Sequence, residues 1–166
     1  MSKIEQVGLD AIDFQILKEL SADGRASDVW LGEKINLSST AVARRRRMLE
    51  ERGAVLSYSA DLNMPMLGFN VVVFVAIELS SQAEGVLNEF EREVVKCPSV
   101  SYCGFVSGDT DFLIMLNVQS FEDYDRVYRS ELSKLPHVSR IRSSFVIREV
   151  ARRATPPIVF ADGSEP

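Results

Sequence analysis

The sequence predicts an α+β protein with two domains: a winged or three-helix helix-turn-helix domain, followed by a βαββαβ domain of ferredoxin-like architecture. Apolar residues recur at helical spacing through the first fifty residues, and β-branched runs alternate with helical segments from Phe69 onward. The length of 166 residues suits two small domains. We therefore expect a helix-turn-helix domain at 1–53, a linker strand and hinge at 54–68, a ferredoxin-like domain at 69–150 and a tail at 151–166.

Two short helices are predicted first. Apolar side chains at helical spacing indicate an amphipathic helix that ends at Gly24. Ser27 or Asp28 can cap a second, shorter helix. Asn36 can supply the left-handed residue that a tight turn needs before a third helix begins. A short helix, a tight turn and a longer helix are typical of the helix-turn-helix unit.

The third helix concentrates positive charge. It should begin after Ser38 and end before Gly53, and Ser38–Arg52 contains five arginines and two glutamates. The whole chain has a net charge of −5, but residues 1–60 carry nine basic and nine acidic side chains. The negative excess therefore lies entirely in residues 61–166. One basic helix in an otherwise acidic protein indicates an element that contacts phosphate.

The helical period sorts these arginines by direction. With Val42 and Leu49 facing the core, Arg44 and Arg47 point away from it, and the two arginines between them flank it. Arg46 is expected to lie along the protein surface with its aliphatic stem packed. Double-stranded DNA would be contacted by the helix start and the outward face, with Arg45 reaching phosphate from the side: Ser38, Ser39, Thr40, Arg44, Arg45 and Arg47. The alternative is that the arginine run is only a solvated helix face.

Strands and helices alternate in the rest of the chain. Ala54–Leu62 alternates loosely and predicts a strand, followed by a hinge at Asn63-Met64-Pro65. Four further strands and two helices give the βαββαβ order, with strands at Phe69–Leu79, Val100–Val106, Asp111–Val118 and Val138–Val150. Two helices cover one face of such a sheet. Successive residues of the strands are apolar, however, and they point to opposite faces, so the second face also needs to be buried. We therefore expect the other face to associate with a second copy, as a back-to-back dimer.

Several function classes lack their signatures. The longest apolar run, Val71–Ile77, is too short to span a membrane, and the first ten residues do not form a secretion signal. Cys97 and Cys103 are expected to be reduced thiols of a cytoplasmic protein. No spacing typical of a metal site, a phosphate loop, a dinucleotide fold or a catalytic triad is found, so we predict no metal, no cofactor and no catalytic residues.

Four segments carry a resemblance to a known family. They are LDAIDFQILKELSADGRAS at Leu9–Ser27, DVWLGEKINLSSTAVARRRRMLEERGAV at Asp28–Val55, VSGDTDFL at Val106–Leu113 and LPHVSRIRSSFVIREV at Leu135–Val150. Over about residues 9–150 the chain resembles the Lrp/AsnC "feast/famine" transcriptional regulators. This resemblance implies a RAM/ACT-like second domain, an amino-acid effector, and assembly of dimers into tetramers or octamers.

The resemblance also implies an effector site around a Gly-Asp-x-Asp turn. Gly108, Asp109, Thr110 and Asp111 would hold the ammonium and carboxylate of the amino acid. The effector's side chain would be lined by Phe105, Phe121, Ser144 and Phe145. A carboxylate suits an ammonium, and turn amides suit a carboxylate. From the residues alone, the alternative is an ordinary hairpin turn.

Two residues depart from the family pattern, and two other functions remain as alternatives. Arg46 stands where relatives usually have an aliphatic residue, and would need a partner such as Asp13 or Glu50 if it points inward. Trp30 replaces a usually polar, exposed residue, and we expect it to pack on a neighbouring side chain; the alternative is a contact with another subunit or with DNA. The same architecture occurs in sirohaem decarboxylases, but the single histidine, His137, lies in a predicted loop. The other alternative is an amino-acid sensor that does not bind DNA.

Overall fold

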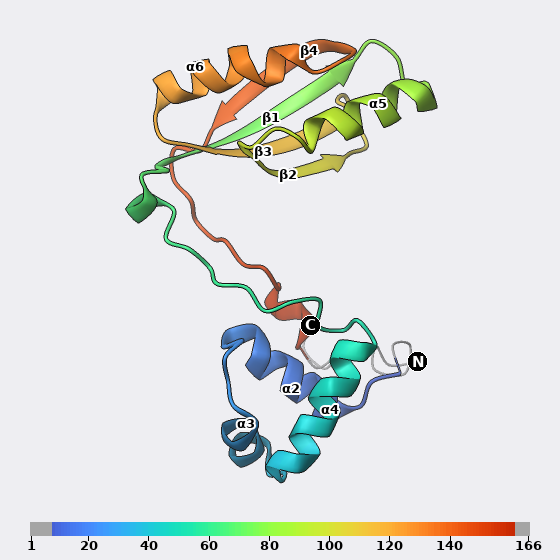
Figure 1. Cartoon of the computed structure of the whole chain (residues 1–166), viewed down its shortest axis with the longest axis vertical. Helices are drawn as coiled ribbons and strands as arrows, with labels where there is room; N and C mark the ends of the chain where they lie inside the picture. The colour runs from blue at the N-terminus through green and yellow to red at the C-terminus, as the bar shows by residue number, and fades with distance from the viewer. Residues whose placement is uncertain (1–7, 162–166) are drawn as a thin grey trace. The chain divides into compact units, whose positions relative to one another are not determined.

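The computed structural model describes residues 8–161, which form two compact units (Figure 1). Residues 8–61 together with 151–161 belong to one unit, and residues 62–150 form the other. The chain therefore passes from one unit to the other twice. The first passage falls inside the predicted linker at 54–68, and the outer limits of the predicted domains, at residues 1 and 166, lie outside the described residues.

The first unit contains the three predicted helices, α2 (Ala11–Ala22), α3 (Asp28–Ile35) and α4 (Ser39–Glu51). Their inward faces form one small apolar core, so the three-helix arrangement is confirmed. The buried side chains of this core are Leu9, Ile16, Leu20, Ala26, Leu31, Val42 and Leu49.

Side-chain caps fix where these helices begin. Ser27 Oγ accepts the backbone N–H of Trp30 at 3.1 Å, and Ser38 Oγ accepts that of Ala41 at 3.2 Å. Asn36 has φ of +58°, which confirms the left-handed residue predicted for the turn. Gly24 does not end α2, because the helix stops at Ala22 and Asp23 follows it in an extended conformation.

The strand predicted at Ala54–Leu62 does not form, so the described chain has no wing. The segment is irregular up to a short 3-10 helix at Pro65–Leu67, and Leu56 within it is 92% exposed. A strand needs a neighbour to bond its backbone groups, and no described segment pairs with this one. Loose alternation of apolar and polar residues is therefore not enough to predict a strand.

The second unit is a four-stranded antiparallel sheet, formed by β1 (Val71–Leu79), β2 (Val100–Phe105), β3 (Phe112–Val118) and β4 (Val138–Phe145). The strand order is β2-β3-β1-β4. With the two helices α5 (Glu84–Val94) and α6 (Phe121–Ser130), this confirms the βαββαβ unit. The last strand ends at Phe145, five residues earlier than predicted, and continues as irregular chain.

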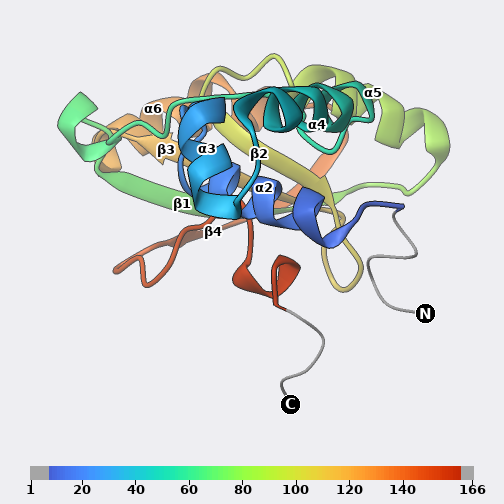
Figure 2. The same ribbon diagram turned by 90° about the horizontal axis from the view of Figure 1, so that it is seen from below.

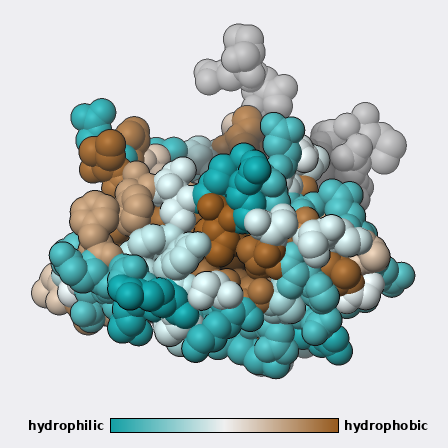
Figure 3. All heavy atoms as spheres, turned by 90° about the horizontal axis from the view of Figure 1, so that it is seen from above, coloured by the Kyte–Doolittle hydropathy of each residue, from teal (hydrophilic) through white to brown (hydrophobic). Residues whose placement is uncertain are grey.

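Both helices cover the same face of the sheet (Figure 2). Alternate residues of β1 and β3, from Val73 to Leu79 and from Phe112 to Val118, are buried there with Phe90 of α5 and Val127 of α6. The residues between them point to the opposite face, where Phe74 stays 38% exposed. Apolar side chains therefore also reach the surface on this face. Figure 3 shows the molecule from above, where hydrophobic residues gather between hydrophilic ones.

Among the described residues no helix is long and apolar enough to cross a membrane.

Candidate functional site

The outward face of α4 is exposed and basic. Ser38, Ser39 and Thr40 at its start, and Arg44 and Arg47 along it, are all exposed. Within residues 8–161, no ion pair engages Arg44 or Arg47. Their directions differ by about 60° around the helix, so both side chains can reach the same ligand. The structure thus brings together five of the six residues predicted to contact DNA.

Arg45, which was predicted to flank the core face and to reach phosphate from the side, is paired with two carboxylates of the protein. Its Nη1 donates to Asp13 Oδ1 at 2.7 Å and to Asp10 Oδ2 at 2.8 Å, and Asp13 is only 3% exposed. The hydrogen bonds that Arg45 donates to Asp13 and Asp10 raise its pKa. Burial opposes the shift at Asp10, but the Asp13 amide and Arg45 lower the pKa of that carboxyl. Arg45 therefore joins α4 to the start of α2, because Asp10 and Asp13, which are distant in the sequence, form ion pairs with it.

Arg46 is also turned inward, and it has more partners. Its Nη1 donates to Ala26 O at 3.0 Å and to Asp28 Oδ1 at 3.2 Å. Its Nε donates to Tyr58 Oη at 2.9 Å, and Glu50 Oε1 lies 3.6 Å from the same nitrogen. Of the two partners considered from the sequence, Glu50 is therefore present, whereas Asp13 binds the neighbouring arginine instead.

Trp30 lies on the exposed side of α3 and is 43% exposed. The Lys34 ammonium sits over its ring, 5.7 Å from the centroid, one helical turn further on. Trp30 therefore packs partly on a neighbour of its own helix.

The Gly108–Asp111 turn precedes β3. Gly108 has φ of +121°, a conformation that side-chain-bearing residues rarely adopt, and Asp109 is exposed. Thr110 Oγ1 donates to Ile77 O at 2.7 Å. Asp111 is 7% exposed, and its carboxylate accepts the N–H of Leu79 and the amide of Gln82, both at 2.8 Å. Asp111 thus shapes the turn, whereas Asp109 is the carboxylate that is open to a ligand.

Two of the remaining predicted effector residues, Phe121 and Phe145, form a separate aromatic cluster with Tyr124. Phe121 and Phe145 have ring centroids 4.8 Å apart, and Tyr124 packs edge-on to Phe145 at 5.0 Å. Ser144 is exposed on the opposite face of β4. Tyr124, whose hydroxyl also bonds Ser143, is a further member of this cluster, and no sequence motif indicated it.

The strand register places these two groups at opposite ends of the sheet. Phe112, next to the turn, pairs with Ile77 of β1, whereas Phe145 pairs with Val73. Four residues of strand separate these positions, about 13 Å. Phe105 pairs with Phe112 and so lies at the turn end. One chain therefore does not assemble all eight predicted effector residues into a single pocket.

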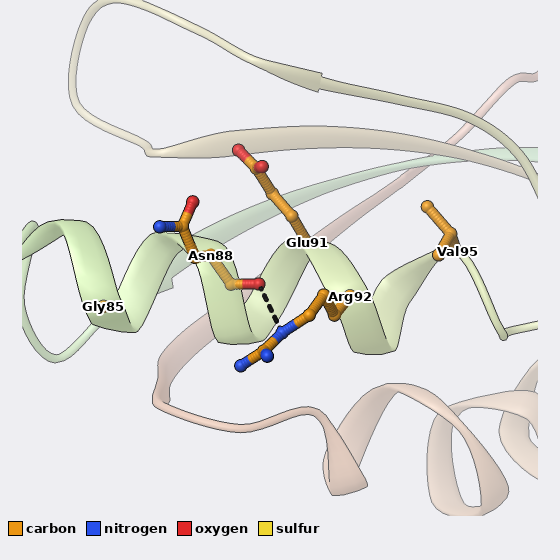
Figure 4. Close-up of a pocket in the computed structure, with 5 residues that line it drawn as sticks. All are labelled: Gly85, Asn88, Glu91, Arg92 and Val95. Atoms are coloured by element: carbon orange, nitrogen blue, oxygen red, sulfur yellow. Dashed lines mark hydrogen bonds between the residues drawn. The ribbon is translucent and has the colours of Figure 1, made fainter.

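A surface hollow does occur on α5, lined by Gly85, Asn88, Glu91, Arg92 and Val95 (Figure 4). Arg92 Nε donates to the backbone oxygen of Asn88 at 3.2 Å, as the dashed line marks. None of the predicted effector residues lines this hollow. In the described part of the chain, no cluster of three His, Cys, Asp or Glu residues could hold a metal ion.

Comparisons with known proteins agree with both units. Residues 9–50 match the AsnC-type helix-turn-helix domain, and residues 72–156 match the Lrp/AsnC ligand binding domain. The leucine-responsive regulatory protein of Rhizobium meliloti is 37% identical over 150 residues, covering 89% of this chain and 94% of that protein. The chain belongs to the Lrp/AsnC family. It is an Lrp/AsnC-type DNA-binding transcriptional regulator with an amino-acid effector domain, and not an enzyme.

Two other proteins are similar to this chain over nearly its whole length. The Bkd operon transcriptional regulator of Pseudomonas aeruginosa is 35% identical, covering 90% of this chain and 98% of that protein. A transcriptional regulator from Neisseria meningitidis, solved as a complex with L-Met, superimposes with a TM-score of 0.85 at 28% identity, covering 90% of this chain and 97% of that one. The helix-turn-helix and the sheet domain of this Lrp/AsnC protein are thus shared over nearly its whole length.

Proposed function

We propose that this Lrp/AsnC regulator contacts double-stranded DNA through the exposed start of α4 and through Arg44 and Arg47. The observation that carries this proposal is the split of the arginine run, because two of its members are held inside the protein and the other two face solvent. Guanidinium groups bind both phosphate and guanine edges, and the hydroxyls of Ser38–Thr40 suit phosphate. Arg45 is left out of the proposed interface because Asp10 and Asp13 hold it.

The test is DNA binding as a function of salt. Arg47→Ala and Arg44→Ala should each weaken binding, and an arginine that contacts phosphate should lower the salt slope by about one unit. Arg92→Ala, an exposed arginine on α5, removes the same charge outside the proposed interface and should leave the slope unchanged. If Arg44→Ala and Arg47→Ala both bind like the unaltered protein, α4 does not read DNA through this face.

We further propose that the open face of the sheet pairs with a second copy of the chain. Apolar side chains of β1 and β3 lie on it, and Tyr102 of β2 adds a ring that is 54% exposed: Val72, Phe74, Ala76, Tyr102, Leu113 and Met115. Covering such a face removes apolar surface from water. A two-fold dimer also presents two copies of α4 to two DNA half-sites. Higher assembly into tetramers or octamers would build on this dimer.

Sedimentation or light scattering of the full chain tests the dimer. Phe74→Glu places a charge in the middle of the proposed interface and should shift the protein toward monomer. Leu56→Glu is the matched control, because Leu56 is 92% exposed and lies outside the sheet. A dimer that survives Phe74→Glu would rule out this face as the contact.

The proposed effector is an amino acid held around the Gly108–Asp111 turn. Exposed Asp109 is the group for the ammonium, and the amides of the turn suit the carboxylate. Since the aromatic cluster of Phe121 and Phe145 lies at the other end of the sheet, we propose that it lines the same site from a neighbouring copy. L-Met is the first candidate, because the Neisseria regulator was solved with it.

As a DNA-binding regulator, the protein would act in the cytoplasm.

A thermal-shift screen against the common amino acids tests this site. A ligand at 100 times its dissociation constant stabilises the folded protein by about 2.7 kcal/mol. Asp109→Ala should abolish the shift, while Asp61→Ala, an exposed carboxylate in the connecting segment, should preserve it. A full shift in Asp109→Ala would show that the turn carboxylate does not hold the effector.

A further inference from the structure

Arg46, on α4, contacts two other parts of the DNA-binding unit: the corner between α2 and α3, and the segment that follows α4. Its guanidinium donates to the carbonyls of Gly24, at 3.4 Å, and Ala26, at 3.0 Å, and to the carboxylate of Asp28. These residues form the corner between α2 and α3. The side chain is 19% exposed, so its bonds are largely shielded from water. Arg46 thus binds α4 to that corner through two backbone carbonyls of the connection between α2 and α3 and through the carboxylate of Asp28.

Tyr58 completes this network from the segment that follows α4. Its hydroxyl accepts from Arg46 Nε at 2.9 Å and donates to Glu50 Oε1 at 2.7 Å. The Tyr58 ring also lies 4.9 Å from the guanidinium carbon. Burial raises the pKa of this hydroxyl first, and the bond to Glu50 adds to the shift. The phenol therefore stays protonated and continues to donate to Glu50.

We propose that Arg46 and Tyr58 are positioning residues for DNA recognition: they fix the orientation of α4 so that Arg44 and Arg47 face the duplex. Around the helix, Arg46 lies about 200° from Arg44, so it cannot reach the same DNA surface. Only a planar guanidinium has donors directed to all of these acceptors, whereas a lysine ammonium is a point charge. The role therefore depends on the shape of the side chain and not on its charge alone.

The experiment compares DNA affinity, salt slope and fluorescence of the full chain. Arg46→Met and Arg46→Lys should each weaken DNA binding about tenfold, which corresponds to 1.4 kcal/mol. The salt slope should not change, because Arg46 contacts no phosphate. Trp30, the single tryptophan, lies two residues from Asp28 and should shift its emission when the corner loosens. Tyr58→Phe keeps the ring and removes the hydroxyl, so it should show a smaller loss with the same unchanged slope.

The outcomes separate this proposal from the one on which it rests. A lowered slope in Arg46→Met would show that Arg46 contacts DNA directly and would overturn the positioning role. Wild-type affinity in Tyr58→Phe would remove Tyr58 from it. That variant loses one hydroxyl from a side chain that is 46% exposed, so it tests the network even if Arg46→Met does not fold. Failure of Arg44→Ala and Arg47→Ala to alter binding would contradict the DNA face instead.

Discussion

Different interactions stabilise the two units of this regulator internally. Among the described residues, thirteen buried apolar side chains form the core of the sheet unit, but only seven form that of the helix unit. The helix unit adds a buried carboxylate, Asp13, and two inward-facing arginines. These arginines link α2, α3, α4 and the segment that follows α4. The only buried polar side chain of the sheet unit, Asp111, accepts a backbone N–H and a side-chain amide, and forms no ion pair.

This difference follows from size. A small domain buries a smaller fraction of its surface, so three short helices gain little from apolar contact alone. Charged networks add directional contacts, but each ion must be fully paired to offset the loss of its hydration. The comparison indicates that the sheet unit tolerates polar substitutions poorly at its apolar core, whereas the helix unit depends on single charges.

The largest effect is expected in the sheet unit. Phe90 is fully buried and packs against Phe112 with ring centroids 4.5 Å apart. Phe90→Ala should lower the free energy of unfolding by about 3–5 kcal/mol through lost contacts and the cavity that remains. Chemical denaturation measures this change. A loss below about 1 kcal/mol would show that the sheet core can collapse around the missing ring.

A smaller effect is expected from breaking the buried pair in the helix unit. Asp13→Ala removes the partner of Arg45 and should cost about 3 kcal/mol, since an inward-facing charge is left without its main acceptor. Asp10→Ala removes the more exposed partner and the helix cap, and should cost about 1 kcal/mol. Hydrogen exchange should show both losses in α2 and α4 but not in the sheet. Equal effects of the two variants would contradict the dominance of Asp13.

The smallest effect concerns acid. The pKa of Asp10 is lowered below its ordinary 3.8 in the folded protein, so its ionised form contributes stability that is present above pH 3.8 and lost as the pH falls through the folded value. A carboxyl titration followed by NMR should give an Asp10 midpoint below 3.8. Arg45→Met should move this midpoint upward. An unchanged midpoint in that variant would show that Arg45 does not stabilise the carboxylate.

Local patterns predicted the helices and the succession of strands and helices along the chain. Ser27, Ser38 and Asn36 act within a few residues of their own position, so their roles can be deduced from neighbouring residues. The facing of Arg44 and Arg47 follows from the helical period alone. The resemblance supplied the nature of the effector, which no spacing of residues indicated.

Contacts between distant residues account for what the sequence did not show. Asp10 and Asp13 lie 35 and 32 positions from Arg45, the arginine that they bind, so no local pattern indicates either pairing. Asp111 likewise reaches an amide of β1 that is 32 positions away. The strand predicted at Ala54–Leu62 failed for the converse reason, because alternation says nothing about whether a pairing partner exists.

The double passage of the chain between the units affects the order of biosynthesis. Residues 62–150 are continuous, so the sheet unit can fold as soon as that stretch has left the ribosome. The helix unit also includes residues 151–161, so its last contacts form only after the whole sheet unit has been made. The sheet unit can therefore fold while the contacts of residues 151–161 with the earlier-made helix unit are still missing.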